Sequence, residues 1–104
     1  NNMLKLKGTT IYPPAINDVL DNSPEVVNYV VVASTSSAGT DEVLVRVGVR
    51  PDCHDQAALI AELKNRFRAR LRVSPNVEIV PVDLIQAINF PAKSRKPIKF
   101  IDQR

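Results

Sequence analysis

Residues 26–49 read VVNYVVVASTSSAGTDEVLVRVGV and are the most strongly patterned part of the chain. The run from Val26 to Thr35 is almost continuously apolar, which is typical of a strand that is covered on both faces and lies centrally in a sheet. A polar turn follows through residues 34–40. Valines then recur at 43, 45 and 47 with the two-residue period of a second strand. Together the two runs predict a β-hairpin at the centre of a sheet.

The segment after this hairpin predicts a long amphipathic helix from about Asp55 to Leu71. Its apolar residues recur at the helical period and fall on one face: Leu59, Ile60, Leu63, Phe67 and Leu71. Acidic residues near its start and arginines near its end match the polarity of the helix dipole. Beyond it, the alternation in Val77 to Val80 predicts another strand, whereas residues 82–88 fit either a helical turn or a loop.

The segment before the hairpin is predicted to hold a short strand, a turn and a short helix. Lysine and leucine alternate within residues 3–7, and Gly8 allows a turn. Residues 10–12 then either pair back as a second strand or lead directly into the helix. Two prolines suit the first turn of that helix, whose apolar residues are Ile16, Val19 and Leu20. At the other end of the chain, residues 98–101 form a short strand or a tail.

This order of elements predicts one α+β domain. After an initial short β-hairpin, the order α–β–β–α–β is close to a ferredoxin-like two-layer sandwich, with a mainly antiparallel sheet and two helices on one face. The chain of 104 residues has room for a single hydrophobic core. We therefore expect residues 1–104 to form one domain.

Composition excludes several classes of protein. With 44% hydrophobic and 24% charged residues, the chain has the profile of a soluble globular domain. No apolar run approaches the roughly 20 residues needed to cross a bilayer. The net charge of +3 is too small to indicate a nucleic-acid partner. The single cysteine, Cys53, cannot form an internal disulfide, which agrees with a cytoplasmic location. Cys53 and His54 have no second pair of ligands, so we expect no metal site.

The two ends of the chain carry motifs that resemble one enzyme family. Residues 3–16, MLKLKGTTIYPPAI, are similar to the segment that opens the C-terminal domain of phenylacetate–CoA ligases. That segment has the form Met-aliphatic-x-x-Arg/Lys-Gly-x-Asn-aliphatic-aromatic-Pro-x-x-Ile. Residues 96–104, KPIKFIDQR, resemble the family's terminal Gly-Lys-x-x-Arg-aliphatic-aliphatic-Asp-x-Arg. Because the motifs stand at opposite ends, the resemblance spans essentially the whole chain.

The resemblance implies a role in adenylate-forming chemistry. Enzymes of this family activate a carboxylic acid with ATP to an acyl-adenylate and then transfer the acyl group to CoA. ATP and CoA are co-substrates, and Mg²⁺ is expected at the large N-terminal adenylation domain, which this chain does not contain. The small domain acts as a mobile lid and has that large domain as its partner. Residues 1–104 would then be a C-terminal lid domain, inactive in isolation.

Lys96 is the residue that the resemblance assigns to adenylation. A lysine ammonium that bridges the α-phosphate and the attacking carboxylate would offset their repulsion in the transition state. Considered without the resemblance, a lysine in a tail that also holds Lys93, Arg95 and Lys99 is more often simply solvated. Arg95 stands where the family usually has glycine, which leaves Lys93 as an alternative to Lys96.

The loop around Gly8 is the second segment to which the resemblance assigns a role. In the family this loop faces the active site during thioester formation and lines the passage for the pantetheine arm of CoA. The implied cofactor-binding residues are Lys7, Gly8, Thr9, Thr10 and Tyr12. Thr10 stands where asparagine is usual, so no role of its side chain is carried over. Without the resemblance, a tight turn explains Gly8 equally well.

Other interpretations of the sequence give different partners. Four arginines, Arg66, Arg68, Arg70 and Arg72, would suit the phosphates of CoA, but residues two apart diverge on a helix and solvated charges explain them better. The main alternative function is a free-standing regulatory module of ferredoxin-like fold that binds a small molecule. A domain of this kind can also expose apolar surface, which would favour a homodimer.

Overall fold

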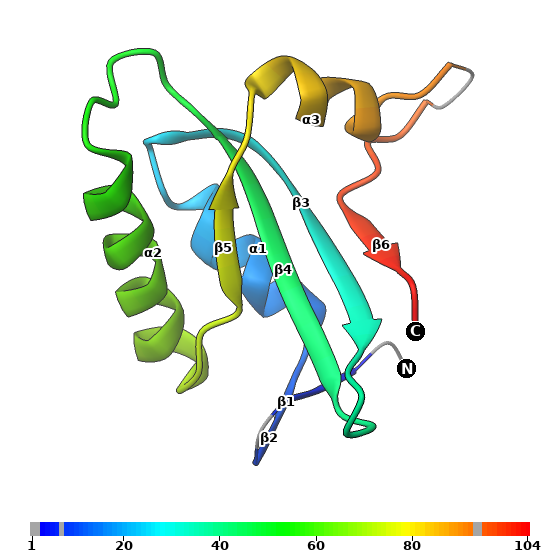
Figure 1. Cartoon of the computed structure of the whole chain (residues 1–104). Helices are drawn as coiled ribbons and strands as arrows, with labels where there is room; N and C mark the ends of the chain where they lie inside the picture. Colours follow the sequence, from blue (N-terminus) through cyan, green and yellow to red (C-terminus); the bar gives the residue numbers. More distant parts are fainter. Residues whose placement is uncertain (1–2, 7, 93–94) are drawn as a thin grey trace.

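The computed structural model describes residues 3–6, 8–92 and 95–104, so Lys7 and Lys93 lie outside the described residues. The helices are α1 (Pro13–Asp21), α2 (Gln56–Leu71) and α3 (Val82–Asn89). The strands are β1 (Leu4–Leu6), β2 (Thr9–Ile11), β3 (Val26–Thr35), β4 (Asp41–Val49), β5 (Asn76–Ile79) and β6 (Phe100–Asp102). The predicted α+β sandwich with an initial hairpin is confirmed (Figure 1).

The main sheet has the strand order β5-β4-β3-β6. Strands β3 and β4 form the predicted antiparallel hairpin, and their register runs from Val26↔Val49 to Thr35↔Asp41. Both outer strands are parallel to their neighbours, so the sheet is mixed and not mainly antiparallel as expected. The reason lies in the connections. Helix α2 carries the chain back to the end of the sheet where β4 began, and α3 delivers it to the end where β3 begins (Figure 1).

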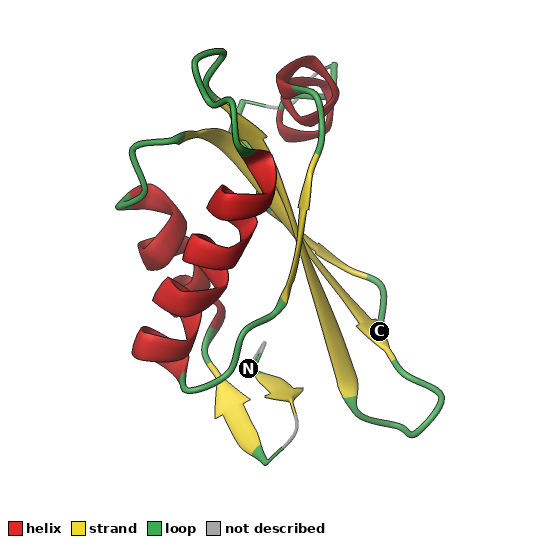
Figure 2. Cartoon of the chain, turned by 60° about the vertical axis from the view of Figure 1, so that its left-hand side comes forward, coloured by secondary structure: helices red, strands yellow, loops and turns green. Residues whose placement is uncertain are grey.

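Helices cover both faces of the central strands, which explains the continuous apolar run of β3. Helices α1 and α2 lie together on one face, as expected, and bury Val31 and Val45 in the main core (Figure 2). The segment 82–88, for which a helix and a loop were both open, forms α3 on the opposite face. Val30 and Ile85 are 0% exposed there. Strand β3 therefore buries alternate side chains against different helices.

The long helix α2 begins and ends with local capping contacts. The Asp55 carboxylate accepts a hydrogen bond from the Ala58 amide at 3.0 Å, so the predicted first residue is the cap and not part of the helix. After the predicted last residue, Leu71, the chain turns at Arg72 with a left-handed φ of 73°. The amide of Arg72 donates to the carbonyl of Arg68 at 2.8 Å, which closes the last turn.

Strands β1 and β2 pair as an antiparallel hairpin, which answers the question left open for residues 10–12. The register joins Leu4 to Ile11 and Leu6 to Thr9. Leu4 and Ile11 are 0% and 3% exposed, so one face of the hairpin is part of the core. Gly8 lies at the tip with a φ of 71°, a conformation that favours glycine.

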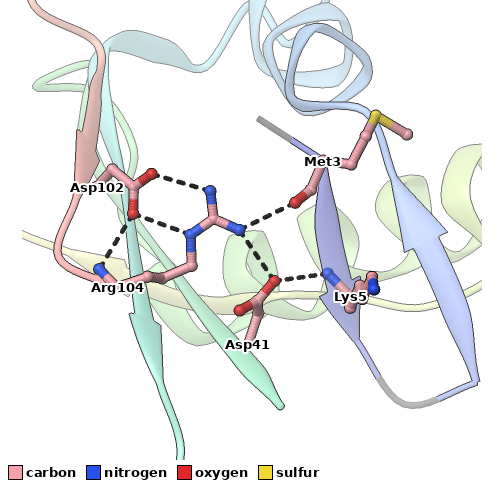
Figure 3. Close-up of polar contacts among 5 residues, drawn as sticks. All are labelled: Met3, Lys5, Asp41, Asp102 and Arg104. Carbon is pink, nitrogen blue, oxygen red and sulfur yellow. Dashed lines mark hydrogen bonds and ion pairs between the residues drawn. The ribbon is translucent and has the colours of Figure 1, made fainter. Parts of the chain in front are cut away.

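A polar cluster around Arg104 attaches this hairpin to the sheet (Figure 3). The Arg104 guanidinium donates to the Met3 carbonyl at 2.9 Å and to the Asp41 carboxylate at 3.1 Å. The same guanidinium binds both oxygens of Asp102, each at 2.9 Å. Asp41 also accepts a hydrogen bond from the Lys5 amide at 2.7 Å. Three segments that are distant in sequence, at β1, β4 and the end of β6, are thus joined by one arginine.

We predict that Gly48→Ala destabilises the chain by about 1–3 kcal/mol, because it overpacks a buried site. A Cβ on Gly48 would contact Asn28 Oδ1 and lie 3.0 Å from the Cα of Val82, which is the first residue of α3. The free energy of unfolding, measured by chemical denaturation, checks this.

Gly39→Ala is the matched control for Gly48→Ala. Gly39 has a φ of 87° but nothing within 4 Å of an added Cβ, so only backbone strain of about 1–2 kcal/mol is expected. Adding Asn28→Ala to Gly48→Ala should recover part of the loss. A Gly48→Ala chain as stable as the parent would contradict the close approach of α3 to β4.

We also predict that acid weakens the attachment of the hairpin. Hydrogen bonds from Arg104 lower the pKa of Asp102 from its ordinary 3.8 to about 2. A carboxyl whose pKa is lower in the folded than in the unfolded chain contributes stability above its unfolded pKa. That contribution should be complete above about pH 4 and lost as the pH falls toward 2.

Carboxyl titration by NMR measures the pKa of Asp102 directly. In Arg104→Gln, the midpoint should return toward 3.8, and exchange of the Lys5 amide hydrogen should become faster. An unchanged midpoint in that variant would show that Arg104 does not hold Asp102 in solution.

Candidate functional site

Lys96 belongs to the connection between α3 and β6. That connection lies at the end of the sheet where β3 begins (Figure 1). The residue is exposed, as are its neighbours Arg95 and Pro97. The connection rejoins the body of the domain at Ile98, whose amide donates to the carbonyl of Asn89 at 2.7 Å. The sequence-predicted lysine is therefore on an exposed loop whose return point is fixed at the end of α3.

Asn89 is the buried polar residue at this return point. It is 3% exposed and donates through Nδ2 to the carbonyls of Tyr29, at 3.1 Å, and of Ile98, at 2.7 Å. Sequence analysis did not single it out. Its partners are backbone carbonyls outside α3, and no local pattern in the sequence marks them.

Lys99, three residues after Lys96, has an aromatic neighbour. Its ammonium lies 5.3 Å from the centre of the Tyr29 ring, within the range of a cation–π contact. The Tyr29 hydroxyl donates to Asp21 at 2.9 Å. Burial, together with that hydrogen bond, raises the pKa of Tyr29, so it stays a neutral phenol. Lys99 thus contributes to the packing of the tail on β3.

A cavity of about 380 Å³ adjoins this loop. Its walls come from the end of α1, the start of β3, the end of α3 and the tail, and they include Asn28, Gln86, Phe90, Pro97 and Lys99. The exposed apolar residues Val27 and Phe90 stand beside it. The surface next to Lys96 is therefore a concave patch with both apolar and polar groups.

The second predicted segment, around Gly8, lies at the tip of the β1–β2 hairpin. Gly8 and Thr10 are exposed, and Thr9 is half-buried. Nothing lies within 4 Å of a Cβ placed on Gly8, so the space next to the turn is open. Tyr12 is 58% exposed at the start of α1. The predicted residues Gly8, Thr9, Thr10 and Tyr12 are thus close in sequence and accessible, while Lys7 lies outside the described residues.

The two predicted segments lie at opposite ends of the domain. The hairpin is bound to Asp41, at the start of β4, and to Arg104, which follows β6 (Figure 3). Lys96 precedes β6, on the connection from α3, and that connection enters β6 at the end opposite the hairpin (Figure 1). The structure therefore places the two segments at different ends of the main sheet.

Two arginines of α2, Arg66 and Arg70, bind acidic groups of the same chain, whereas Arg68 donates to the Asn65 side chain at 3.2 Å. Arg66 pairs with both oxygens of Glu25, at 3.0 and 3.2 Å, and with Glu62 at 3.2 Å. The hydrogen bonds from Arg66 lower the pKa of Glu25. Arg70 lies 3.6 Å from Asp18 of α1. These pairs join α1, α2 and the start of β3, so they have a structural role.

The part of the chain that the structure describes holds neither a cluster of metal ligands nor a membrane-spanning helix. Within residues 3–6, 8–92 and 95–104, no group of three or more histidine, cysteine, aspartate or glutamate side chains is placed to hold a metal ion. None of the described helices is long and apolar enough to cross a membrane.

Comparison with known proteins identifies one family. Residues 8–104 match the family described as AMP-binding enzyme C-terminal domain. A domain of phenylacetate–coenzyme A ligase from Bacteroides vulgatus ATCC 8482 has the same fold, with a TM-score of 0.69 and 24% sequence identity over 97% of this chain and 92% of that one. No curated protein sequence matches significantly.

Two larger enzymes contain a domain of this fold. A 2-hydroxyisobutyryl-CoA ligase, solved with 2-HIB-AMP and CoA in the thioesterification state, aligns with a TM-score of 0.71 and 28% identity over 100% of this chain. A Brucella canis acyl-CoA synthetase aligns with a TM-score of 0.72 and 20% identity over 95% of this chain. The chain covers 22% and 18% of these enzymes. Since the family match extends over nearly all of its length, the chain belongs to the family of AMP-binding enzyme C-terminal domains.

Proposed function

We propose that this chain is the mobile C-terminal domain of an ATP-dependent ligase that joins an aryl acid, such as phenylacetate, to CoA. The family match supports an AMP-forming ligase over a free-standing regulatory module. The observation that carries the proposal is the placement of the two predicted segments at opposite ends of one domain. A domain that turns between two orientations would present one end for adenylation and the other for thioester formation.

Lys96 supplies the positive charge for the first step in this proposal. Attack of the substrate carboxylate on the α-phosphate of ATP brings two anionic groups together, and pyrophosphate leaves. An ammonium group that contacts both would stabilise the charge that develops in the transition state. An exposed loop allows Lys96 to enter the active site of the large domain and to leave it again.

The hairpin around Gly8 serves the second step. In this step the CoA thiol attacks the carbonyl of the acyl-adenylate, and AMP leaves. The open space at Gly8 and its exposed position would allow the backbone of the turn to approach the pantetheine arm closely. Lys7, Thr9 and Tyr12 are proposed as the neighbouring contacts, together with the backbone of Thr10.

The remaining components are assigned to the rest of the enzyme. The pocket for the acid and most of the ATP site belong to the large domain, as does the Mg²⁺ that accompanies ATP. The preference for an aryl acid rests on the resemblance of the end motifs to phenylacetate–CoA ligases. We propose that this domain binds its large domain as a partner and acts in the cytoplasm.

We predict that Lys96→Ala in the intact ligase lowers acid-dependent adenylate formation by about 100-fold or more, because a positioned charge is lost from the transition state. Pyrophosphate release measures the first step. Transfer from supplied acyl-adenylate to CoA should be retained, because Lys96 acts only in adenylation.

Lys99→Ala is the control for Lys96→Ala, since Lys99 contacts Tyr29 and should affect adenylation little. If Lys96→Ala leaves adenylation unchanged, Lys93 or Lys99 becomes the candidate. If none of the three lysines matters, the proposed role of this loop is wrong.

We predict that Gly8→Leu slows thioester formation at least tenfold and leaves adenylation unchanged. A bulky side chain would occupy the open space at the hairpin tip and narrow the proposed CoA passage. Gly39→Leu is the matched control, because Gly39 is also a turn glycine with positive φ and open space. Equal effects of the two variants on CoA transfer would assign Gly8 to turn geometry alone.

A further inference from the structure

We propose that Asn89 is a positioning residue for the adenylation lysine, holding the loop that carries Lys96 in a fixed place on the domain. The proposal rests on the proposed function of Lys96. It assigns Asn89 no contact with substrate. Asn89 would act by fixing the chain two residues away from Lys96.

The contacts of Asn89 form a closed arrangement with the tail. Its backbone carbonyl accepts from the Ile98 amide at 2.7 Å, and its side-chain Nδ2 donates to the Ile98 carbonyl at the same distance of 2.7 Å. The second proton of Nδ2 is directed to the Tyr29 carbonyl at 3.1 Å. One residue at the end of α3 therefore binds both backbone groups of Ile98 and joins them to β3.

The position of Tyr29 explains why its carbonyl needs a side-chain donor from Asn89. Pairing between β3 and β6 begins at Val31↔Phe100, and the Val31 amide donates to the Lys99 carbonyl at 2.8 Å. Tyr29 lies two residues before that point, where the tail is no longer paired with β3. Asn89 supplies the donor to the Tyr29 carbonyl at the place where strand pairing stops. A buried carbonyl without a donor is costly, so this contact also stabilises the junction.

The hydrogen bonds between Asn89 and Ile98 form an anchor, and the length of chain from that anchor limits how far Lys96 can move. With Ile98 fixed, two residues of chain confine the Lys96 Cα to within about 7 Å of the anchor. Without it, the next residue held to β3 is Lys99, whose carbonyl accepts from the Val31 amide. Lys99 is three residues away from Lys96, so the radius grows to about 10 Å. Since a misplacement of about 1 Å at a reacting group can cost about 100-fold in rate, this confinement bears directly on adenylation.

The first test compares Asn89→Ala with Gln86→Ala in the intact ligase. Gln86 is an exposed residue on the same helix and borders the same cavity, so it is a matched control. We expect Asn89→Ala to lower the kcat of adenylation by about 10- to 100-fold through misplacement of the lysine. Transfer from supplied acyl-adenylate to CoA should change less than twofold, and Gln86→Ala should match the parent in both steps. Equal losses in both steps would overturn the proposal, because they indicate a general structural role.

The second test combines Asn89→Ala with Lys96→Ala. If Asn89 acts through Lys96, the double variant should adenylate no more slowly than Lys96→Ala alone. Independent, multiplicative losses would overturn the proposal. A Lys96→Ala enzyme with normal adenylation would refute the proposed role of Lys96 itself, which separates the two failures.

A third variant tests the anchor without changing the buried asparagine, in case Asn89→Ala does not fold. Ile98→Pro removes the amide that donates to the Asn89 carbonyl, and Ile98→Ala keeps that amide. We expect adenylation to fall at least tenfold in Ile98→Pro relative to Ile98→Ala, with CoA transfer retained in both. Equal adenylation rates in the two variants would show that the anchor at Ile98 does not position Lys96.

Discussion

The antiparallel pairing of β3 with β4 is the constraint on which the other elements of this domain depend. In its register, Tyr29, Val31 and Ala33 face the same side of the sheet as Val43, Val45 and Val47, and α1 and α2 cover that side. A slip of one residue between the two strands would turn one of these rows of apolar side chains to the wrong face. The same register places Asn28 opposite Gly48, which is where α3 approaches the other face.

The parallel outer strands follow from the helices that connect them, and they determine where the two candidate segments lie. Because β6 runs parallel to β3, the chain enters β6 at the α3 end and leaves it beside the β1–β2 hairpin. A mainly antiparallel sheet would have reversed this direction for β6. Lys96, which precedes β6 in the chain, would then lie at the hairpin end of the sheet and not at the α3 end. The separation of the two segments is therefore a property of the topology, and it suits an enzyme whose two half-reactions use different orientations of one small domain.

Sequence patterns predicted the long elements well and the short ones less well. The hairpin strands and α2 carry enough residues for their periods to be distinct, and their capping chemistry is local. Helix α3 spans only eight residues, so its apolar pattern did not exclude a loop. The mixed sheet was not predicted, because strand direction depends on where a connection ends and not on the strand's own composition.

The contacts that organise the candidate site had no local signal in the sequence. Asn89 and Tyr29 are 60 residues apart, and Arg104 and Met3 are 101 apart. Each contact joins a side chain to a backbone carbonyl that belongs to a different element, so no spacing pattern marks it in advance. The roles of Lys96 and of the Gly8 loop came from the resemblance of the end motifs, and they stay predictions that the enzyme itself must test.

Strand β6 links these distant contacts and shows why both are needed. It has three residues, Phe100–Asp102, at the edge of the sheet, and so short a parallel pairing provides little stability by itself. Asn89 holds the chain just before the strand, and Arg104 holds it just after. Asn89 fixes the loop of Lys96, whereas Arg104 fixes the hairpin of Gly8. The short strand therefore keeps its place because polar contacts secure both of its ends, and those contacts also position the two segments proposed to act in the two half-reactions.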